Sequence, residues 1–411
     1  MTSTQAKPQR QAPRPFFYLM LVSTVIIGVL LMIPMLVTWR TQGDYLVHLD
    51  YTLQLLRGDL GTVLPLVPNI LYHVSAFVPY YLNDGMGVVD ALIVGNLPWY
   101  GLLLLVAFLW LRRYEGRALL LVALTSLALL LVAPLAFFTP ENLYFGYLTP
   151  NVYHNPTMIP LRPTSLLLFI AAVAAFRPTA ADWPAWVRWG RIPLVALLTW
   201  ACILAKPSYL MILLPALALL TLYRMVRKQA IDWPLLLGGI VIPAGVILGV
   251  QALTFTRGAI AWEPVRTFWE WSLHYDPNAD TGLLLKWLLS VAFPLAVYAL
   301  YWRTAYRSLM LNLAWLCFVI GVLYAYLLVD TGEVAAGNLV WNAQIGTFVL
   351  FAASAAHWLR HWRMWSGWQD WRGWLPFVIC GLLLVAHVLA GLHWYQLHLN
   401  AEFLDLIYIW W

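Results

Sequence analysis

The chain has 411 residues, of which 62% are hydrophobic and only 10% are charged. A soluble domain averages about 45–50% apolar and about 25% charged residues, so most of this surface must face lipid or other helices. The net charge of +6 is spread in small groups between apolar runs, which excludes a nucleic-acid-binding surface and predicts no nucleic-acid partner.

Long apolar runs dominate the whole chain and predict an all-α, polytopic transmembrane bundle, a single integral membrane domain over residues 1–411. A helix needs about 20 apolar residues to cross the hydrocarbon, and the runs suffice for about eleven spans. The first run follows Lys7, Arg10 and Arg14 and has no cleavage site after it, so we expect a retained helix. The expected spans are 16–38, 88–111, 118–138, 162–176, 192–205, 208–223, 235–256, 282–302, 309–329, 339–358 and 374–394.

The basic residues between these spans predict the orientation. Seventeen of the 24 Lys and Arg residues fall in alternate connections, and the positive-inside rule makes those connections cytoplasmic. We therefore expect a cytoplasmic N-terminus and an extracytoplasmic C-terminus, in a bacterial inner or plasma membrane. The outer loops are long, about 39–87, 139–161 and 257–281, and long loops on a rigid scaffold often carry functional sites.

The first outer loop contains a predicted amphipathic helix over residues 43–58. Asp44 is a suitable N-cap and Gly58 a suitable stop. Leucines recur every three or four residues and favour a helix lying on the membrane surface. The later part of the loop, 60–82, is apolar but broken by Pro65, Pro68 and Pro79, and is expected to be interfacial or re-entrant.

Asp44 and His48 are four residues apart and share one face of this predicted helix. Two interpretations stay open. Asp44 could cap the helix and pair with His48, or the two could form a general base with its tuning neighbour. Asp50 lies on another face and is a candidate substrate contact.

This arrangement resembles the GT-C class of membrane glycosyltransferases, which use sugars linked to polyprenyl phosphates. In that class a catalytic Asp follows the first transmembrane helix, and a juxtamembrane helix comes next. Gly43, Asp44, Tyr45, Leu46 and Val47 occupy that position here. Many members carry an Asp-Glu pair, whereas Tyr45 follows Asp44. The resemblance implies that Asp44 is the catalytic base.

The second outer loop, residues 139–163, is rich in Pro, Asn and aromatic residues. Tyr153, His154 and Asn155 could stack on a sugar and bond to it, or the tyrosines could form an ordinary membrane-interface belt. Arg162 ends this loop and could contact a phosphate.

Two short apolar runs, 192–205 and 208–223, flank Lys206 and Pro207, and predict two helices too short to cross. A lysine at bilayer depth usually has a partner, and a lipid phosphate would be suitable. The alternative is that Lys206 reaches up to the interface.

The third outer loop adds Glu263 as a candidate substrate contact and the turn Asp276–Asp280. That turn could ligate a hard cation or be a plain solvated turn. Cys202, Cys317 and Cys380 lie in apolar runs and are expected to be buried. No metal site or cofactor is expected, although a divalent cation stays open.

Together these features predict an inverting glycosyltransferase with Asp44 as base and His48 as its partner. The expected partners are a polyprenyl-phosphate sugar donor, membrane lipid, and a glycan, lipid or protein acceptor. Asp50, Tyr153, His154, Asn155, Arg162, Lys206 and Glu263 are the expected substrate contacts. A transporter of a small polar or lipid-linked solute, or a non-catalytic membrane assembly subunit, are the alternatives.

Overall fold

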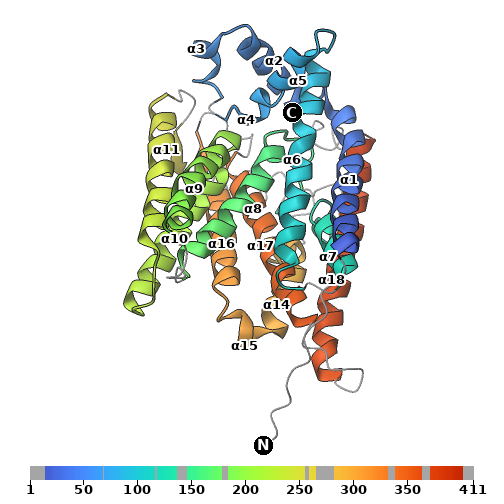
Figure 1. The fold of residues 1–411 in the computed structure, drawn as a ribbon, viewed down its shortest axis with the longest axis vertical. Coiled ribbons are helices and arrows are strands. Elements are labelled where there is room, and N and C mark those ends of the chain that lie inside the picture. Colours follow the sequence, from blue (N-terminus) through green and yellow to red (C-terminus); the bar gives the residue numbers. More distant parts are fainter. Residues whose placement is uncertain are drawn as a thin grey trace, which may run out of the picture.

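The computed structural model describes residues 14–67, 69–115, 118–136, 146–177, 184–254, 259–264, 282–331, 338–362 and 371–400. These segments are almost entirely helical and pack into one elongated bundle (Figure 1). The described strands β1 (Ile260–Trp262) and β2 (Leu328–Asp330) pair antiparallel, with Ala261 opposite Val329.

Eight described helices are long and apolar enough to cross a membrane. The predicted helical membrane bundle is confirmed at that level, although the described spans fall short of the eleven expected. The eight are α1 (Arg14–Trp39), α6 (Val88–Leu111), α8 (Met158–Ala175), α9 (Ala185–Ala205), α10 (Ser208–Val226), the continuous pair η2 (Pro234–Val241) and α11 (Ile242–Thr254), α16 (Leu309–Leu327), and α18 (Trp371–Leu399).

Three of the expected spans, 118–138, 282–302 and 339–358, are not among these eight. The expected span 118–138 contains only the ten-residue helix α7 (Leu119–Ala128), after which a buried non-helical stretch continues to residue 136. The expected span 339–358 is the helix α17 (Val340–Trp362), which is long enough but carries polar side chains. Residues 342–359 of α17 are all buried, so protein surrounds this helix where lipid would surround an outer one.

The expectation of two short helices around Lys206 was wrong. Helix α9 begins at Ala185, seven residues before the expected start at residue 192, and has 21 residues. Helix α10 has 19 residues. Each is long enough for a full span. Charged residues near the start of α9 lower its local hydropathy. The apolar run in the sequence therefore did not include the first turns of the helix.

A real break occurs instead in the expected span 282–302. Helices α13 (Leu283–Ser290) and α14 (Ala292–Leu300) meet at 73°. The break frees backbone groups that lipid cannot satisfy. His387 of α18 accepts a hydrogen bond from the Phe293 amide through Nε2 (3.2 Å) and donates through Nδ1 to the Ala133 carbonyl (2.6 Å).

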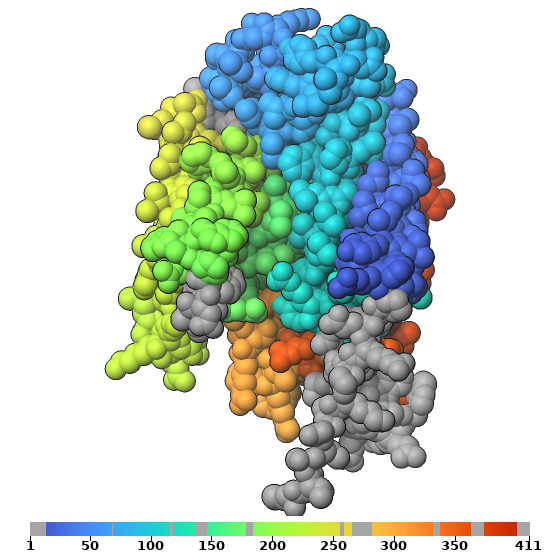
Figure 2. Space-filling model, in the orientation of Figure 1, coloured from blue at the N-terminus to red at the C-terminus, as the bar shows by residue number. Residues whose placement is uncertain are grey.

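The first outer loop forms a helical cap on one end of the bundle, visible in blue and cyan at the top of Figures 1 and 2. We call residues 43–82 the α2–α5 cap. It has its own small apolar core around Tyr51, Leu55, Val63 and Val67. The helix predicted over residues 43–58 is present in the cap, and contact of its leucines with lipid stays a prediction. The cap consists of α2 (Gly43–Leu56), α3 (Leu60–Val63), α4 (Leu71–Val74) and α5 (Phe77–Leu82).

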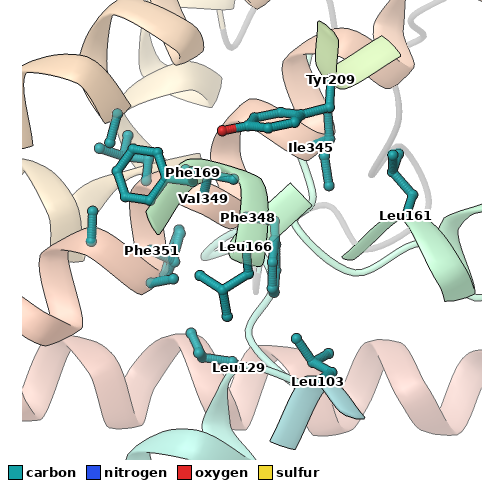
Figure 3. Close-up of a cluster of buried hydrophobic side chains, with 14 of the residues drawn as sticks. Leu103, Leu129, Leu161, Leu166, Phe169, Tyr209, Ile345, Phe348, Val349 and Phe351 are labelled. Atoms are coloured by element: carbon teal, nitrogen blue, oxygen red, sulfur yellow. The ribbon is translucent and has the colours of Figure 1, made fainter. Parts of the chain in front are cut away.

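The main core lies where α6, α8, α10 and α17 meet. Figure 3 shows Leu103 of α6, Phe169 of α8, Tyr209 of α10 and Phe348 of α17 converging there. All four side chains are at most 1% exposed. The core ties the spans together and fixes how the segments at their ends are placed.

The ends of the bundle separate the predicted outer and inner segments. At one end, Asn155 bonds to both Asp44 and Lys206. At the other end Arg191 pairs with Asp232, whose backbone amide bonds to Ala175. These connections therefore lie at opposite ends of the bundle, as the charge pattern predicts. The side of the membrane that each end faces stays a prediction.

Candidate functional site

Asp44 lies in the first turn of α2, close to the end of the long helix α1. We expected Asp44 to cap α2, but the N-cap is Gln42, and no side chain caps the helix. Gly43 has φ of +51°, a left-handed conformation that glycine adopts without strain. This turn leaves the Asp44 carboxylate free for a tertiary contact, and it accepts a hydrogen bond from Asn155 Nδ2 at 2.9 Å.

Asn155 comes from the second outer loop, which the structure describes from residue 146 onward. Most of this part lies inside the bundle, because nearly every residue from 146 to 157 is buried. Asn155 Oδ1 accepts a hydrogen bond from Thr157 Oγ1 at 2.6 Å. The segment is joined to α2 a second time, through Tyr45 Oη, which donates to the Tyr153 carbonyl at 3.1 Å.

Lys206 lies between α9 and α10 and has an extended backbone conformation. Its ammonium group completes the arrangement. Lys206 Nζ lies 3.4 Å from Asn155 Oδ1 and 3.2 Å from Thr157 Oγ1. It also lies 4.8 Å from the ring centre of Trp341, a cation–π distance. We call Asp44, Asn155, Thr157 and Lys206 the Asp44 cluster.

The hydrogen bonds of the Asp44 cluster fix the orientation of the Asn155 amide. Its NH₂ group faces the carboxylate of Asp44 and its oxygen faces the ammonium group of Lys206. Asn155 therefore holds two opposite charges apart while bonding to both. Asp44 and Lys206 are each half-buried, so part of each side chain is exposed.

Burial shifts the pKa values of both groups in the direction that favours their uncharged forms. It raises the pKa of Asp44, and the Lys206 charge and the Asn155 hydrogen bond partly oppose this. It lowers the pKa of Lys206 to about 8, and the charge of Asp44 opposes that shift. A carboxylate with a raised pKa is a stronger base, and an ammonium group in a partly desolvated place binds an anion more firmly.

One helix that begins beside the cluster adds partial positive charge. Helix α10 starts at Ser208, two residues after Lys206, and unpaired amide groups at a helix N-terminus favour anions. Helix α8 also starts here, at Met158, but the amides of Met158 and Ile159 bond to the Asn155 and Pro156 carbonyls. The side of the cluster near Lys206 is therefore suited to a phosphate, and the side near Asp44 to a hydroxyl proton.

His48 does not pair with Asp44 as expected. Its Nδ1 lies 2.9 Å from Nε2 of His73, in helix α4. The cause is the cap, since α4 packs against α2 and fills the space beside His48. Sequence reasoning missed His73 because 25 residues separate the two histidines and no helical spacing relates them.

Tyr153 and Arg162 lie deeper than expected for residues that contact a substrate. Tyr153 is 1% exposed, and its hydroxyl donates to the Leu130 carbonyl at 2.8 Å. Arg162 is also 1% exposed and donates through Nη1 to Asn151 Oδ1. These hydrogen bonds hold the buried loop segment in place inside the bundle. They therefore position Asn155 and its neighbours.

His154 borders the Asp44 cluster through its aromatic neighbours. Its ring lies 5.7 Å from Trp341, the residue that faces Lys206, and 6.2 Å from Trp39 at the end of α1. Burial lowers the pKa of His154, with smaller contributions from His398 and Lys206. Trp341 was not predicted because it lies in the first turn of α17, far along the chain from His154 and Lys206.

The last two expected contacts lie elsewhere. Asp50 is exposed on the outer face of α2 and accepts a hydrogen bond from Gln54 Nε2 at 2.7 Å. Glu263 follows β1, where its amide donates to the Leu327 carbonyl at 3.2 Å. No described contact joins either residue to the Asp44 cluster. The turn at residues 276–280 lies outside the described residues.

Within the described parts of the chain, no group of three or more His, Cys, Asp or Glu side chains is placed to hold a metal ion. Cys202, Cys317 and Cys380 are buried free thiols, as expected. Comparison with known proteins adds no constraint, because no family model, no curated protein and no solved structure matches this chain.

Proposed function

We propose that the chain is an inverting membrane glycosyltransferase that takes a sugar from a polyprenyl-phosphate donor. One observation carries the proposal. A half-buried carboxylate and a half-buried ammonium group from distant segments share one bridging amide at the end of a membrane bundle. This arrangement supplies a base and an anion site side by side.

In the proposed reaction, Asp44 removes the proton from an acceptor hydroxyl. The hydroxyl oxygen attacks the anomeric carbon of the donor as the bond to the phosphate oxygen breaks. The bonding electrons leave with the phosphate, where Lys206 and the first turn of α10 stabilise the negative charge. The donor enters from the lipid and the acceptor from water on the extracytoplasmic side.

The direct test is Asp44→Asn, with Asp50→Asn as the matched control on the same helix. An asparagine at position 44 can still accept the Asn155 hydrogen bond, so the fold should survive. Positioned general bases contribute about 10²–10⁴-fold, and we expect a loss of that size in sugar transfer from polyprenyl-phosphate donors. Asp50→Asn should transfer at the normal rate, because Asp50 is exposed and its side chain bonds to Gln54, away from the Asp44 cluster. Equal activity of the two variants would contradict the proposal.

A transporter is the second candidate, and the bend between α13 and α14 favours it. Broken membrane helices often line transport sites, and Lys286 lies buried in α13. Uptake of a sugar or lipid-linked solute into vesicles, abolished by Lys286→Met but not by Asp44→Asn, would support this function over the transferase.

A further inference from the structure

The histidine pair in the α2–α5 cap stands beside the Asp44 cluster and has no role in the proposed transfer. His48 lies one helical turn beyond Asp44, and residues four apart lie on the same helix face. His48 is half-buried, whereas His73 is fully buried. The pair therefore runs from the interior of the cap to its half-buried surface, on the α2 face that also carries Asp44.

Three observations show how firmly His73 is held. Gly95 of α6 has so little room that an added Cβ would lie 2.0 Å from the Ser75 carbonyl oxygen, so α4 rests directly on α6. Trp99 Nε1 donates to Ser75 Oγ at 2.9 Å. Asn96 Nδ2 reaches the Tyr72 carbonyl at 3.5 Å. His73, between Tyr72 and Ser75, is thus anchored to a membrane-spanning helix.

Aromatic rings enclose the pair. The Tyr51 and Tyr72 rings meet the His48 ring edge-on at 6.1 Å and 5.8 Å. The same two tyrosines lie 6.3 Å and 5.5 Å from the His73 ring. This enclosure lowers the pKa of both imidazoles, that of His73 to about 4. Both rings are neutral at physiological pH, and each carries a single N–H.

The surroundings then decide which nitrogen carries that hydrogen. His73 Nε2 faces His48, and Nδ1 is buried with no hydrogen-bond partner among the described residues. The carbonyl of Ile70, the N-cap residue of α4, raises the His73 pKa, and we assign this effect to Nδ1 because His48 occupies Nε2. A bare nitrogen facing a carbonyl oxygen would be repulsive, so His73 carries its hydrogen on Nδ1 and its Nε2 is an acceptor. His48 must therefore donate from Nδ1 across the 2.9 Å contact. This leaves His48 Nε2 without a hydrogen.

We propose that His73 fixes His48 as a hydrogen-bond acceptor, and that His48 Nε2 binds a second hydroxyl of the acceptor substrate. That hydroxyl neighbours the one that Asp44 deprotonates. The acceptor is accordingly a sugar or polyol with neighbouring hydroxyls, as opposed to a single hydroxyl on a protein or lipid. His73 acts as a positioning residue. The inference rests on the proposed transferase function for its substrate and on the cap alone for its tautomer.

The tautomer is tested by ¹⁵N NMR of the full chain in nanodiscs with ¹⁵N-labelled histidine, the His48 signals being identified by their loss in His48→Gln. We expect a protonated Nδ1 and a bare Nε2. His73→Phe keeps a ring but removes the acceptor, so His48 should shift toward the Nε2–H form. His73→Gln offers an amide oxygen to Nδ1 and should restore the original pattern. A wild-type His48 protonated on Nε2 overturns the inference.

The substrate class is tested with methyl glycosides and their monodeoxy analogues as acceptors. Removing the hydroxyl next to the reactive one should lower kcat/KM about tenfold in the wild type, as expected for one lost hydrogen bond. The penalty should disappear in His48→Phe. Equal use of both acceptors by a wild-type enzyme that Asp44→Asn inactivates overturns this inference alone. Full activity of Asp44→Asn overturns the transferase proposal and this inference with it.

Discussion

At the residue scale, the Asp44 cluster depends on one amide. Asn155 lies 111 residues from Asp44 and 51 from Lys206, yet it bonds to both. Without this bridge, opposite charges would be drawn into a direct pair, which would neutralise the base and the anion site together. The bridge therefore keeps both groups available for ligands.

Titration of Lys206 should make the binding of polyprenyl phosphate depend on pH. Burial lowers its pKa to about 8, so the charged form is fully present only below that value. Binding of a polyprenyl phosphate should be constant from about pH 7, where the phosphate is already mostly dianionic. It should then weaken by up to tenfold per pH unit above about 8. Lys206→Met should lose the affinity at every pH.

Lys206→Arg is the matched variant, because a guanidinium stays charged throughout this range. Its affinity should be lower than that of the wild type, since the geometry differs, but it should not fall between about pH 8 and about pH 10. Binding of radiolabelled polyprenyl phosphate to the protein in nanodiscs measures both. An equal alkaline loss in Lys206→Arg would assign the titration to another group.

At the element scale, local signals predicted the helices well and their contacts poorly. Gly58 was expected to stop the first cap helix, and α2 does end at Leu56, with Gly58 at φ of +88°. The amide of Asp59 bonds to the Gln54 carbonyl, and that of Gly58 to the Leu55 carbonyl, which closes the helix end. A helix-ending glycine can be predicted because the signal lies within a few residues of the helix end.

The glycines of the cap allow a matched test of this helix end. Both Gly58 and Gly61 have open space where a Cβ would be added, but only Gly58 has a left-handed φ. Gly58→Ala should therefore destabilise the cap by about 1–2 kcal/mol. Gly61→Ala, inside α3, should be neutral or stabilising. Hydrogen exchange of the α2 amides measures both effects, and similar exchange in the two variants would contradict the assigned role of Gly58.

The contacts between elements could not be predicted, because no sequence period relates them. Asp44, Asn155 and Lys206 were each predicted as site residues from the sequence, and the structure brings them together, while their role stays a prediction. Their partners Thr157 and Trp341, and the His48 partner His73, gave no comparable signal, since a threonine, a tryptophan and a histidine at a membrane interface are ordinary. Tyr153 appeared to be a surface residue because the tight folding of residues 146–157 into the bundle has no local signature.

At the scale of the whole molecule, the Asp44 cluster and the cap lie at one end, and the Arg191–Asp232 pair lies at the other. The positive-inside rule predicts that the Asp44 end is extracytoplasmic. Two exposed positions test it, Thr62 in the cap and Gln229 after α10. Thr62→Cys should react with an impermeant thiol reagent added to intact cells, and Gln229→Cys should react only after lysis.

The native cysteines Cys202, Cys317 and Cys380 are buried, so background labelling should be small. Reversed labelling would place the Asp44 cluster in the cytoplasm. A donor that is presented on the extracytoplasmic leaflet could then not reach it, and the proposed reaction would lose its substrate.

In the proposed reaction, Lys206 binds a lipid phosphate beside Asp44. The most direct measurement is a cryo-EM map of the protein in nanodiscs with added polyprenyl phosphate. We expect phosphate density within hydrogen-bond distance of Lys206 Nζ, in the space bordered by Asp44, Trp341 and the first turn of α10. Phosphate density at another site, with the Asp44 cluster unchanged, would contradict the account.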